Sequence, residues 1–205
     1  MINNEEKSCA IVLNGESIER EIEDDFIICA DGGAKLLKDR LPDIIIGDSD
    51  SLSATPKGVK TLNFPAIKNE TDGELCVRYA AKEGFKRINF YGVLGGRADH
   101  ILGNYTLLAL ADKLGCVAVA REKGLDIHFA KSFFTLETNK NDTLSVVPFG
   151  GCAVIKQSAG LFYPLENLVL EPFLTRGISN IATESKIILE FEKGEAIVFH
   201  YHLKS

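Results

Sequence analysis

The chain has 205 residues, of which 45% are hydrophobic and 25% charged, and its formal net charge is −6. This composition is typical of a globular protein of one or two domains. No apolar stretch approaches the roughly 20 residues that cross a bilayer, and the first residues, MINNEEKS, lack the order of a secretion signal. We therefore expect a cytoplasmic protein without a membrane partner, and the absence of a basic run argues against nucleic acid as a partner.

Five cysteines, at positions 9, 29, 76, 116 and 152, form no CxxC pair, and four of them lie in apolar or helical segments. Such cysteines typically pack as small hydrophobic side chains in a reducing compartment. We expect neither disulfides nor a zinc site.

Short apolar runs alternate with helical segments from residue 8 to about 121. Continuously apolar runs are typical of strands covered on both faces, and their alternation with helices indicates a doubly wound, mainly parallel α/β sheet. The expected strands are 9–13, 26–30, 44–46, 59–64, 88–93 and 116–120, and the expected helices are 34–40, 72–83 and 99–114. Gly84 and Gly115 end the last two helices.

After about residue 125 the runs are separated by turn residues. The predicted strands are 127–129, 133–137, 143–147, 152–157, 161–163, 167–170, 187–191 and 196–201, with turns in the segments NKND, PFGG and EKGE. We expect a second, all-β domain of antiparallel strands. The domains are placed at 1–123 and 124–205.

Acidic and glycine residues follow the predicted parallel strands at the end where α/β sheets bind ligands. The segments are Asp31-Gly32-Gly33, Gly47-Asp48-Ser49-Asp50, Asn69-Glu70-Thr71-Asp72 and Leu94-Gly95-Gly96-Arg97-Ala98-Asp99-His100. Grouped carboxylates suit Mg²⁺, which shares its positions with substrate phosphates. Glycine-rich turns add backbone N–H groups that can bind an anion. Arg97 adds a guanidinium group, which can donate two hydrogen bonds to one phosphate. Together these segments predict a site for Mg²⁺ and a polyphosphate.

Some of these residues also fit purely structural roles. Asp31 before two glycines fits a turn, Thr71 begins the capping box T-x-x-E, and Asp99 fits a helix N-cap. His100 and Asn104, one helical turn apart, suit either a ligand or packing. Asp48 and Asp50 bring two charges to a strand end with no structural gain, so they favour a functional site.

Other mechanisms lack their motifs. The chain has no G-x-x-x-x-G-K-[ST] phosphate loop and no G-x-G-x-x-G after the first strand. It has no G-x-S-x-G elbow either, so covalent catalysis has little support.

Six motifs in order resemble the thiamine pyrophosphokinase (thiamine diphosphokinase) family. They are DGGA at 31–34, PDIIIGDSDS at 42–51, KNETD at 68–72, GVLGGRADH at 92–100, GLFYPL at 160–165 and GISN at 177–180. The resemblance implies an N-terminal α/β domain, a C-terminal β-sandwich and a homodimer with active sites between subunits. It also implies transfer of the β,γ-diphosphoryl group of ATP to the hydroxyl of thiamine, giving thiamine diphosphate and AMP.

On this resemblance each candidate residue receives a role. Asp48, Asp50 and Asp72 are assigned to Mg²⁺, with Asp31 as a further ligand of the metal or as a residue that supports the ligands. Asp72 is the first candidate for accepting the hydroxyl proton. The nucleotide and its phosphates are assigned to Asp31, Gly32, Gly33, Lys68, Asn69, Thr71, Gly95, Gly96 and Arg97. Thiamine is assigned to Asp99 and His100, with Ser179 and Asn180 from the partner subunit. Asp48, Asp50, Asp72 and Arg97 form the catalytic set.

Two readings from other classes remain. A haloacid-dehalogenase-like phosphohydrolase also uses D-x-D after an apolar strand, although that motif usually follows the first strand, whereas Asp48-Ser49-Asp50 follows the third. A thiamine or nucleotide sensor without turnover is the other, because a fold does not fix a function.

Overall fold

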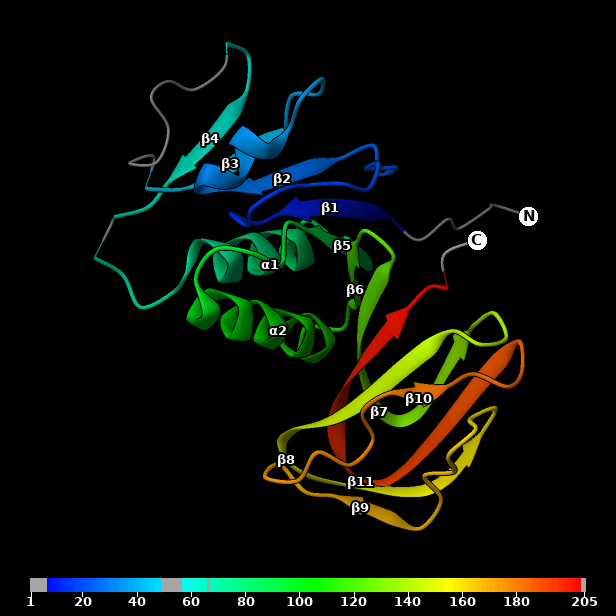
Figure 1. Cartoon of the computed structure of the whole chain (residues 1–205). Helices are drawn as coiled ribbons and strands as arrows, with labels where there is room; N and C mark the ends of the chain where they lie inside the picture. The colour runs from blue at the N-terminus through cyan, green and yellow to red at the C-terminus, as the bar shows by residue number, and fades with distance from the viewer. Residues whose placement is uncertain (1–6, 49–56, 66, 204–205) are drawn as a thin grey trace, which may run out of the picture. The chain divides into compact units, whose positions relative to one another are not determined.

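The computed structural model describes residues 7–48, 57–65 and 67–203, and the chain divides into two compact units, Met1–Lys123 and Gly124–Ser205 (Figure 1). Among the described residues, no helix combines the length and the apolar character needed to cross a membrane.

The first unit is built on a parallel sheet. Its strands are β1 (Ser8–Val12), β2 (Ile27–Ala30), β3 (Ile44–Gly47), β4 (Lys60–Asn63), β5 (Arg87–Tyr91) and β6 (Val117–Glu122). They lie in the order β6-β5-β1-β2-β3-β4, and each pair is parallel. The residues of β1, β2 and β3 are almost completely buried because both faces of the sheet are covered.

Different segments cover the two faces. Alternate residues of the strands, among them Val12, Ile27 and Tyr91, pack with Ile18, Ile22 and a short 3-10 helix, η1 (Asp31–Leu36). Helices α1 (Asp72–Lys82) and α2 (Ala98–Lys113) pack against each other (Figure 1). Helix α1 also contacts β1, β2 and β3, and helix α2 contacts β6. The predicted helix 34–40 is wrong, because the helical turn begins at Asp31 and Leu37 is already extended. The cysteines at 9, 29, 76 and 116 are buried in this unit, as predicted for small hydrophobic side chains.

The order in which strands are added to the sheet changes direction at β1. Successive strands extend from β1 toward β4 on one side, whereas β5 and β6 lie on the other. The two turns that follow β1 and β5 touch: a Cβ on Gly15 would lie 2.3 Å from the Gly92 carbonyl oxygen. Such a switch point is where open α/β sheets bind ligands.

The second unit is antiparallel. Its strands are β7 (Leu125–Glu137), β8 (Thr143–Ala159), β9 (Leu168–Leu170), β10 (Asn180–Ile181) and β11 (Lys186–Tyr201). β11 pairs with both β7 and β8, and β8 also pairs with β9 and β10. A core that includes Leu144, Ile155, Leu170 and Leu189 is buried between these strands.

Three long strands replace six predicted short ones. The segments PFGG and EKGE are not turns between strands, because β8 and β11 continue through them. They are irregularities: the register of β11 shifts between Glu190 and Glu195, and Gly150 and Gly194 have positive φ. Glycine inside a strand often marks a bulge rather than its end. The predicted strand at 161–163 is also wrong, since only an isolated bridge joins Leu161 to Ala182.

Candidate active site

The first unit holds a cavity of about 550 Å³ at the carboxyl ends of its strands. Both helices and the turns after β1, β2, β3 and β5 contribute to its walls. Its lining residues are Leu13, Asn14, Ala30, Asp31, Asp48, Lys68, Glu70, Thr71, Asp72, Gly73, Glu74, Gly95, Asp99, His100, Gly103, Asn104, Thr106 and Leu107. The structure thus brings together side chains from all four of the acidic and glycine segments.

Asp31 is the most constrained carboxylate of the cavity. It follows β2 directly, it is only 7% exposed, and its φ of 39° lies in the left-handed region that disfavours non-glycine residues. Gly47 permits this position, since a Cβ there would lie 2.7 Å from Asp31 Cβ. Among the described residues, nothing hydrogen-bonds to the buried Oδ1 atom of Asp31. A buried carboxylate oxygen of this kind is suited to an ion that the protein takes up.

A second carboxylate stands at the start of α1. Thr71 caps this helix, since its hydroxyl accepts a hydrogen bond from the backbone N–H of Glu74 at 3.2 Å. The cap fixes Asp72 at the first helical position, where Lys68 Nζ lies 2.7 Å from Asp72 Oδ1. Thr71 is therefore both a cap and a wall of the cavity. Lys68 is the cation that the structure places among these acids.

The lining carries more negative than positive charge. Asp31, Asp48, Asp72, Glu70, Glu74 and Asp99 face it, with Lys68 as the lysine among its lining residues. Glu74 is bonded to Arg78, at 2.7 and 2.9 Å. An acidic cavity with oxygen ligands from three strand or helix ends suits a hard divalent cation such as Mg²⁺.

Helix α2 forms the opposite wall. Asn104 donates from Nδ2 to the Val93 carbonyl oxygen at 2.8 Å, which ties the helix to the turn after β5. Asn104 therefore has a packing role, whereas His100, one turn earlier, is exposed at the cavity. Asp99 lies beside it and is held by Arg97, at 2.6 Å between Arg97 Nη2 and Asp99 Oδ2. That hydrogen bond lowers the pKa of Asp99 below its usual value.

Glycines allow the backbone turns to pack closely around this cavity. A Cβ on Gly33 would lie 2.4 Å from the Val12 carbonyl oxygen, and one on Gly32 would lie 2.8 Å from Asn14 Oδ1. Gly95 and Gly96 both have positive φ. Of these four, only Gly95 is among the described residues that line the cavity.

Several predicted site residues lie elsewhere. Asp50 lies outside the described residues. Asn69 and Arg97 are exposed and do not belong to the described lining. Ser179 and Asn180 belong to the second unit, where Asn180 is only 2% exposed and its amide bonds to the backbone of Tyr163 at 3.0 and 2.7 Å. Ser179 is exposed, with a φ of 58°.

The structure also adds residues that the motifs did not single out. Gly103, Thr106 and Leu107 line the cavity from α2, at helical spacing from His100. The signal that could have found them is this periodicity, because residues three, four and seven positions apart share a helix face. Asn14 comes from the turn after β1, at the switch point.

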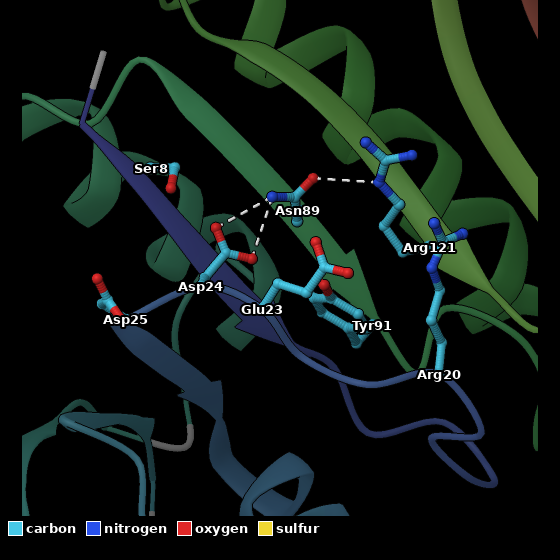
Figure 2. A pocket seen from close by; sticks show the side chains of 8 residues that line it. All are labelled: Ser8, Arg20, Glu23, Asp24, Asp25, Asn89, Tyr91 and Arg121. Atoms are coloured by element: carbon cyan, nitrogen blue, oxygen red, sulfur yellow. Dashed lines mark hydrogen bonds between the residues drawn. The ribbon is translucent and has the colours of Figure 1, made fainter. Parts of the chain in front are cut away.

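A second cavity, of about 270 Å³, is lined by polar residues of β1, β5, β6 and the segment before β2 (Figure 2). Asn89 joins two of its charged groups: it donates to Asp24 at 3.0 Å and accepts from Arg121 Nε at 3.3 Å. Burial, aided by the charge of Asp24, raises the pKa of Tyr91 to about 12, so its phenol stays protonated. Ser8 begins β1, so this cavity includes the amino end of that strand. The larger cavity, in contrast, lies at the carboxyl ends of the strands, where α/β sheets bind ligands. We therefore take the larger cavity as the candidate active site.

Comparison with known proteins identifies the family. The family model described as the catalytic domain of thiamin pyrophosphokinase matches residues 20–119. The thiamine pyrophosphokinase of Bacillus subtilis (strain 168) is 30% identical over 166 residues, which cover 77% of this chain and 78% of that protein. This chain belongs to the thiamine pyrophosphokinase family. The family member from Caenorhabditis elegans, thiamin pyrophosphokinase 1, is 27% identical over 227 residues, covering 98% of this chain and 92% of that protein.

Solved structures of the family have the same fold. The crystal structure of the Bacillus subtilis thiamine pyrophosphokinase matches with a TM-score of 0.84 and 26% identity, over 96% of this chain and 99% of that one. The yeast thiamin pyrophosphokinase matches with a TM-score of 0.81 over 98% of this chain and 88% of that one, and its 18% identity makes this a likeness of fold.

Proposed function

We propose that this protein is a thiamine diphosphokinase, which transfers the β,γ-diphosphoryl group of ATP to the hydroxyl of thiamine and releases thiamine diphosphate and AMP. The observation that carries the proposal is the acidic cavity at the switch point, in a chain whose relatives bear this name.

The reaction needs orientation and charge neutralisation more than covalent chemistry. The thiamine oxygen forms a bond to the β-phosphorus while the bond from that phosphorus to the α,β-bridging oxygen breaks, and AMP leaves with the electron pair. The hydroxyl proton passes to a base, for which we propose the Asp72 carboxylate. Catalysis then rests on holding the alcohol and the β-phosphorus in line.

The acids fit Mg²⁺, which would neutralise the phosphate charges when bound. Asp31, Asp48 and Asp72 are the proposed ligands, and the buried Oδ1 atom of Asp31 is the observation that supports this set. Asp50 joins the proposed set on its sequence position alone. Asp72 would have to exchange its ion pair with Lys68, which frees that lysine for a phosphate.

The nucleotide phosphates would be held between the start of α1 and the turn after β5. Lys68, Thr71 and the Gly95 amide line the cavity and are the nearest candidates. Gly32, Gly33 and Gly96 shape the surrounding turns, and Asn69 follows Lys68 in the chain. Arg97 would reach a phosphate only by leaving Asp99, and we propose that substrate binding makes this exchange.

Thiamine would bind at the α2 wall, where Asp99 and His100 are exposed to the cavity. The acidic lining favours its fixed positive thiazolium charge. We propose that Ser179 and Asn180 of the second subunit of a homodimer complete this pocket. The side-chain amide of Asn180 is already hydrogen-bonded to the backbone of Tyr163. The exposed Ser179 is therefore the stronger candidate for contact with thiamine.

We further propose that the second unit is a two-layer β-sandwich and that the enzyme works in the cytoplasm. The bends in β8 and β11 at Gly150 and Gly194 would let each long strand run in both layers. In β7, Ser132 also has a positive φ. It lies beside the irregular part of β11, because its neighbour Lys131 pairs with Glu195.

An assay for both products tests the function. Purified protein is incubated with ATP, MgCl₂ and thiamine, and AMP and thiamine diphosphate are separated by chromatography. We expect equal amounts of both, none without metal, and at least about a hundredfold loss of turnover in Asp72→Asn. Asp39→Asn, an exposed acid outside the cavity lining, is the control and should keep full activity.

Three outcomes contradict the proposal. Free phosphate without thiamine indicates a hydrolase, ADP indicates a simple kinase, and thiamine binding without turnover indicates a sensor.

A further inference from the structure

Three titratable side chains converge in the second unit, apart from the acids of the candidate active site. One ligand atom from each of Asp142, His200 and His202 lies within 4.8 Å of the others. Asp142 is fully buried, His200 is 2% exposed, and the His202 side chain is 32% exposed. The proposed function assigns no role to them.

Strand register explains why they meet. His200 is in the last part of β11, and His202 lies one residue beyond the end of that strand. Extended backbone puts residues two apart on the same face, and the two imidazole rings lie side by side. His200 pairs with Asp126 of β7 on one side and with Leu144 of β8 on the other, and Asp142 stands two residues before Leu144. Strands β7 and β11, the residue before β8 and the residue after β11 thus bring two imidazoles and two carboxylates together.

The cluster is held in place by the backbone. Asp142 Oδ1 accepts a hydrogen bond from the Leu203 N–H, and its Oδ2 accepts one from the Asn139 N–H, each at 2.8 Å. His200 Nε2 lies 2.7 Å from the same Oδ2 atom. A carboxylate bound by three such groups has a fixed orientation, as metal-ligating carboxylates have.

His202 is less completely paired. Its Nε2 atom is buried and has no hydrogen bond among the described residues. Asp126 Oδ2 is 3.4 Å away from it, and the rings of His200 and His202 have centroids 4.3 Å apart. Ligands around a tetrahedral zinc ion lie about 3.3 Å from one another, because the bonds are about 2.0 Å long. The imidazole nitrogen of His202 is therefore at a suitable distance from its acidic neighbour.

We propose that Asp142, His200 and His202 bind a divalent transition-metal ion of the zinc class, with Asp126 or water as the fourth ligand. Two imidazoles and a carboxylate are a donor set typical of zinc. On binding, His200 Nε2 exchanges its hydrogen bond with Asp142 for the metal, and the two atoms separate to about 3.3 Å. Any proton on Nε2 passes to solvent. The expectation of no zinc site was drawn from the cysteines alone and did not consider this combination of histidines and an aspartate.

Zinc binding to the full chain tests the site. Protein stripped with EDTA and desalted is titrated with Zn²⁺ against a chromogenic chelator, and with Co²⁺ to record visible absorption. We expect one Zn²⁺ per chain and a Co²⁺ spectrum of tetrahedral type. His202→Gln should weaken Zn²⁺ binding by about tenfold or more.

Two control variants separate this site from others. His128→Gln changes a histidine of β7 outside the cluster, and Asp72→Asn removes an acid of the candidate active site. Both should bind Zn²⁺ as the unchanged protein does. The proposal is overturned if no Zn²⁺ binds in competition with the chelator, if His202→Gln binds as well as His128→Gln, or if Asp72→Asn abolishes the binding. Because the His202 side chain is one-third exposed, the variant should fold, and its Tm in EDTA checks this.

Discussion

Asp31 combines features that a purely structural residue would avoid. It is buried, its φ is 39°, and its Oδ1 atom has no hydrogen bond among the described residues. A left-handed non-glycine residue costs roughly 1–2 kcal/mol, and a buried carboxylate costs more unless it is paired. Strain of this kind is usually kept at functional sites. Its cost is understandable if Asp31 holds a cation.

Replacing this aspartate should therefore separate stability from activity. Asp31→Asn keeps the shape and tolerates the left-handed region, but it removes the charge. We expect the free energy of unfolding to stay the same or rise by up to about 1 kcal/mol, while turnover falls by at least about a hundredfold. Urea unfolding and steady-state kinetics at saturating Mg²⁺ measure the two. Turnover within threefold of normal would remove Asp31 from the metal set, and a large loss of stability would contradict the strain argument.

The positions of the acids at the candidate site could be predicted from the sequence, because they depend only on where the strands end and where α1 begins. Asp31 and Asp48 directly follow parallel strands and Asp72 begins α1, and the structure brings all three to one cavity. Side-chain partners were not predictable in this way. Arg97 is bonded to Asp99, and Asn180 is bonded to Tyr163, because of local geometry that motif spacing does not contain.

At the scale of elements, the active site depends on how closely the turns after β1 and β5 approach. Gly15 has carbonyl oxygens of Gly92 and Leu94 at 2.3 and 2.5 Å from the position of a Cβ. These are backbone atoms, so a side chain there cannot be accommodated by rotation of a neighbour. The contact holds together the two turns that bring Asn14 and Gly95 to the cavity lining.

A methyl group at this contact should disturb the site. Gly15→Ala is expected to lower the free energy of unfolding by about 1–3 kcal/mol, as overpacking does. It should also raise the KM for ATP, because the Gly95 turn moves away from β1. Gly151→Ala in β8 is the control, since a Cβ there meets nothing within 4 Å, and it should change stability little. Unchanged stability and KM in Gly15→Ala would mean that the two turns separate without effect on the site.

Sequence patterns predicted elements unequally, for a physical reason. Apolar runs covered on both faces, such as β1 and β3, were found because burial dictates every residue in them. β8 and β11 were each divided in two, since glycines at 150 and 194 indicate turns when the neighbouring strand is unknown. Pairing between the strands keeps these segments extended through a bulge.

At the scale of the whole molecule, we expect stability to depend on pH through a partly buried acid at the end of β6. Glu122 ends β6, and its carboxylate accepts hydrogen bonds from the N–H groups of Val93 and Leu94 at 2.6 and 3.3 Å. Burial raises the pKa of Glu122 above its ordinary value of 4.5, and these two hydrogen bonds oppose the shift only in part. The turn after β5, which carries the glycine motif, is thus held by a group that resists ionisation.

This pKa shift makes a signed prediction for pH and stability. The folded protein binds the Glu122 proton more tightly than the unfolded chain does, so its contribution is full below pH 4.5 and is lost as pH rises through the raised pKa. Glu122→Gln keeps an acceptor and has no proton to lose. The measured quantity is the free energy of unfolding of the unchanged protein minus that of the variant, from urea unfolding. This difference should therefore decrease as the pH rises from 4.5 to 7. Glu19→Gln is the control of opposite sign, because a hydrogen bond and the charge of Lys123 lower the pKa of Glu19, so its difference should rise with pH. If the Glu122→Gln difference also rises with pH, ionised Glu122 stabilises the turn, and burial is not the dominant influence on this carboxylate.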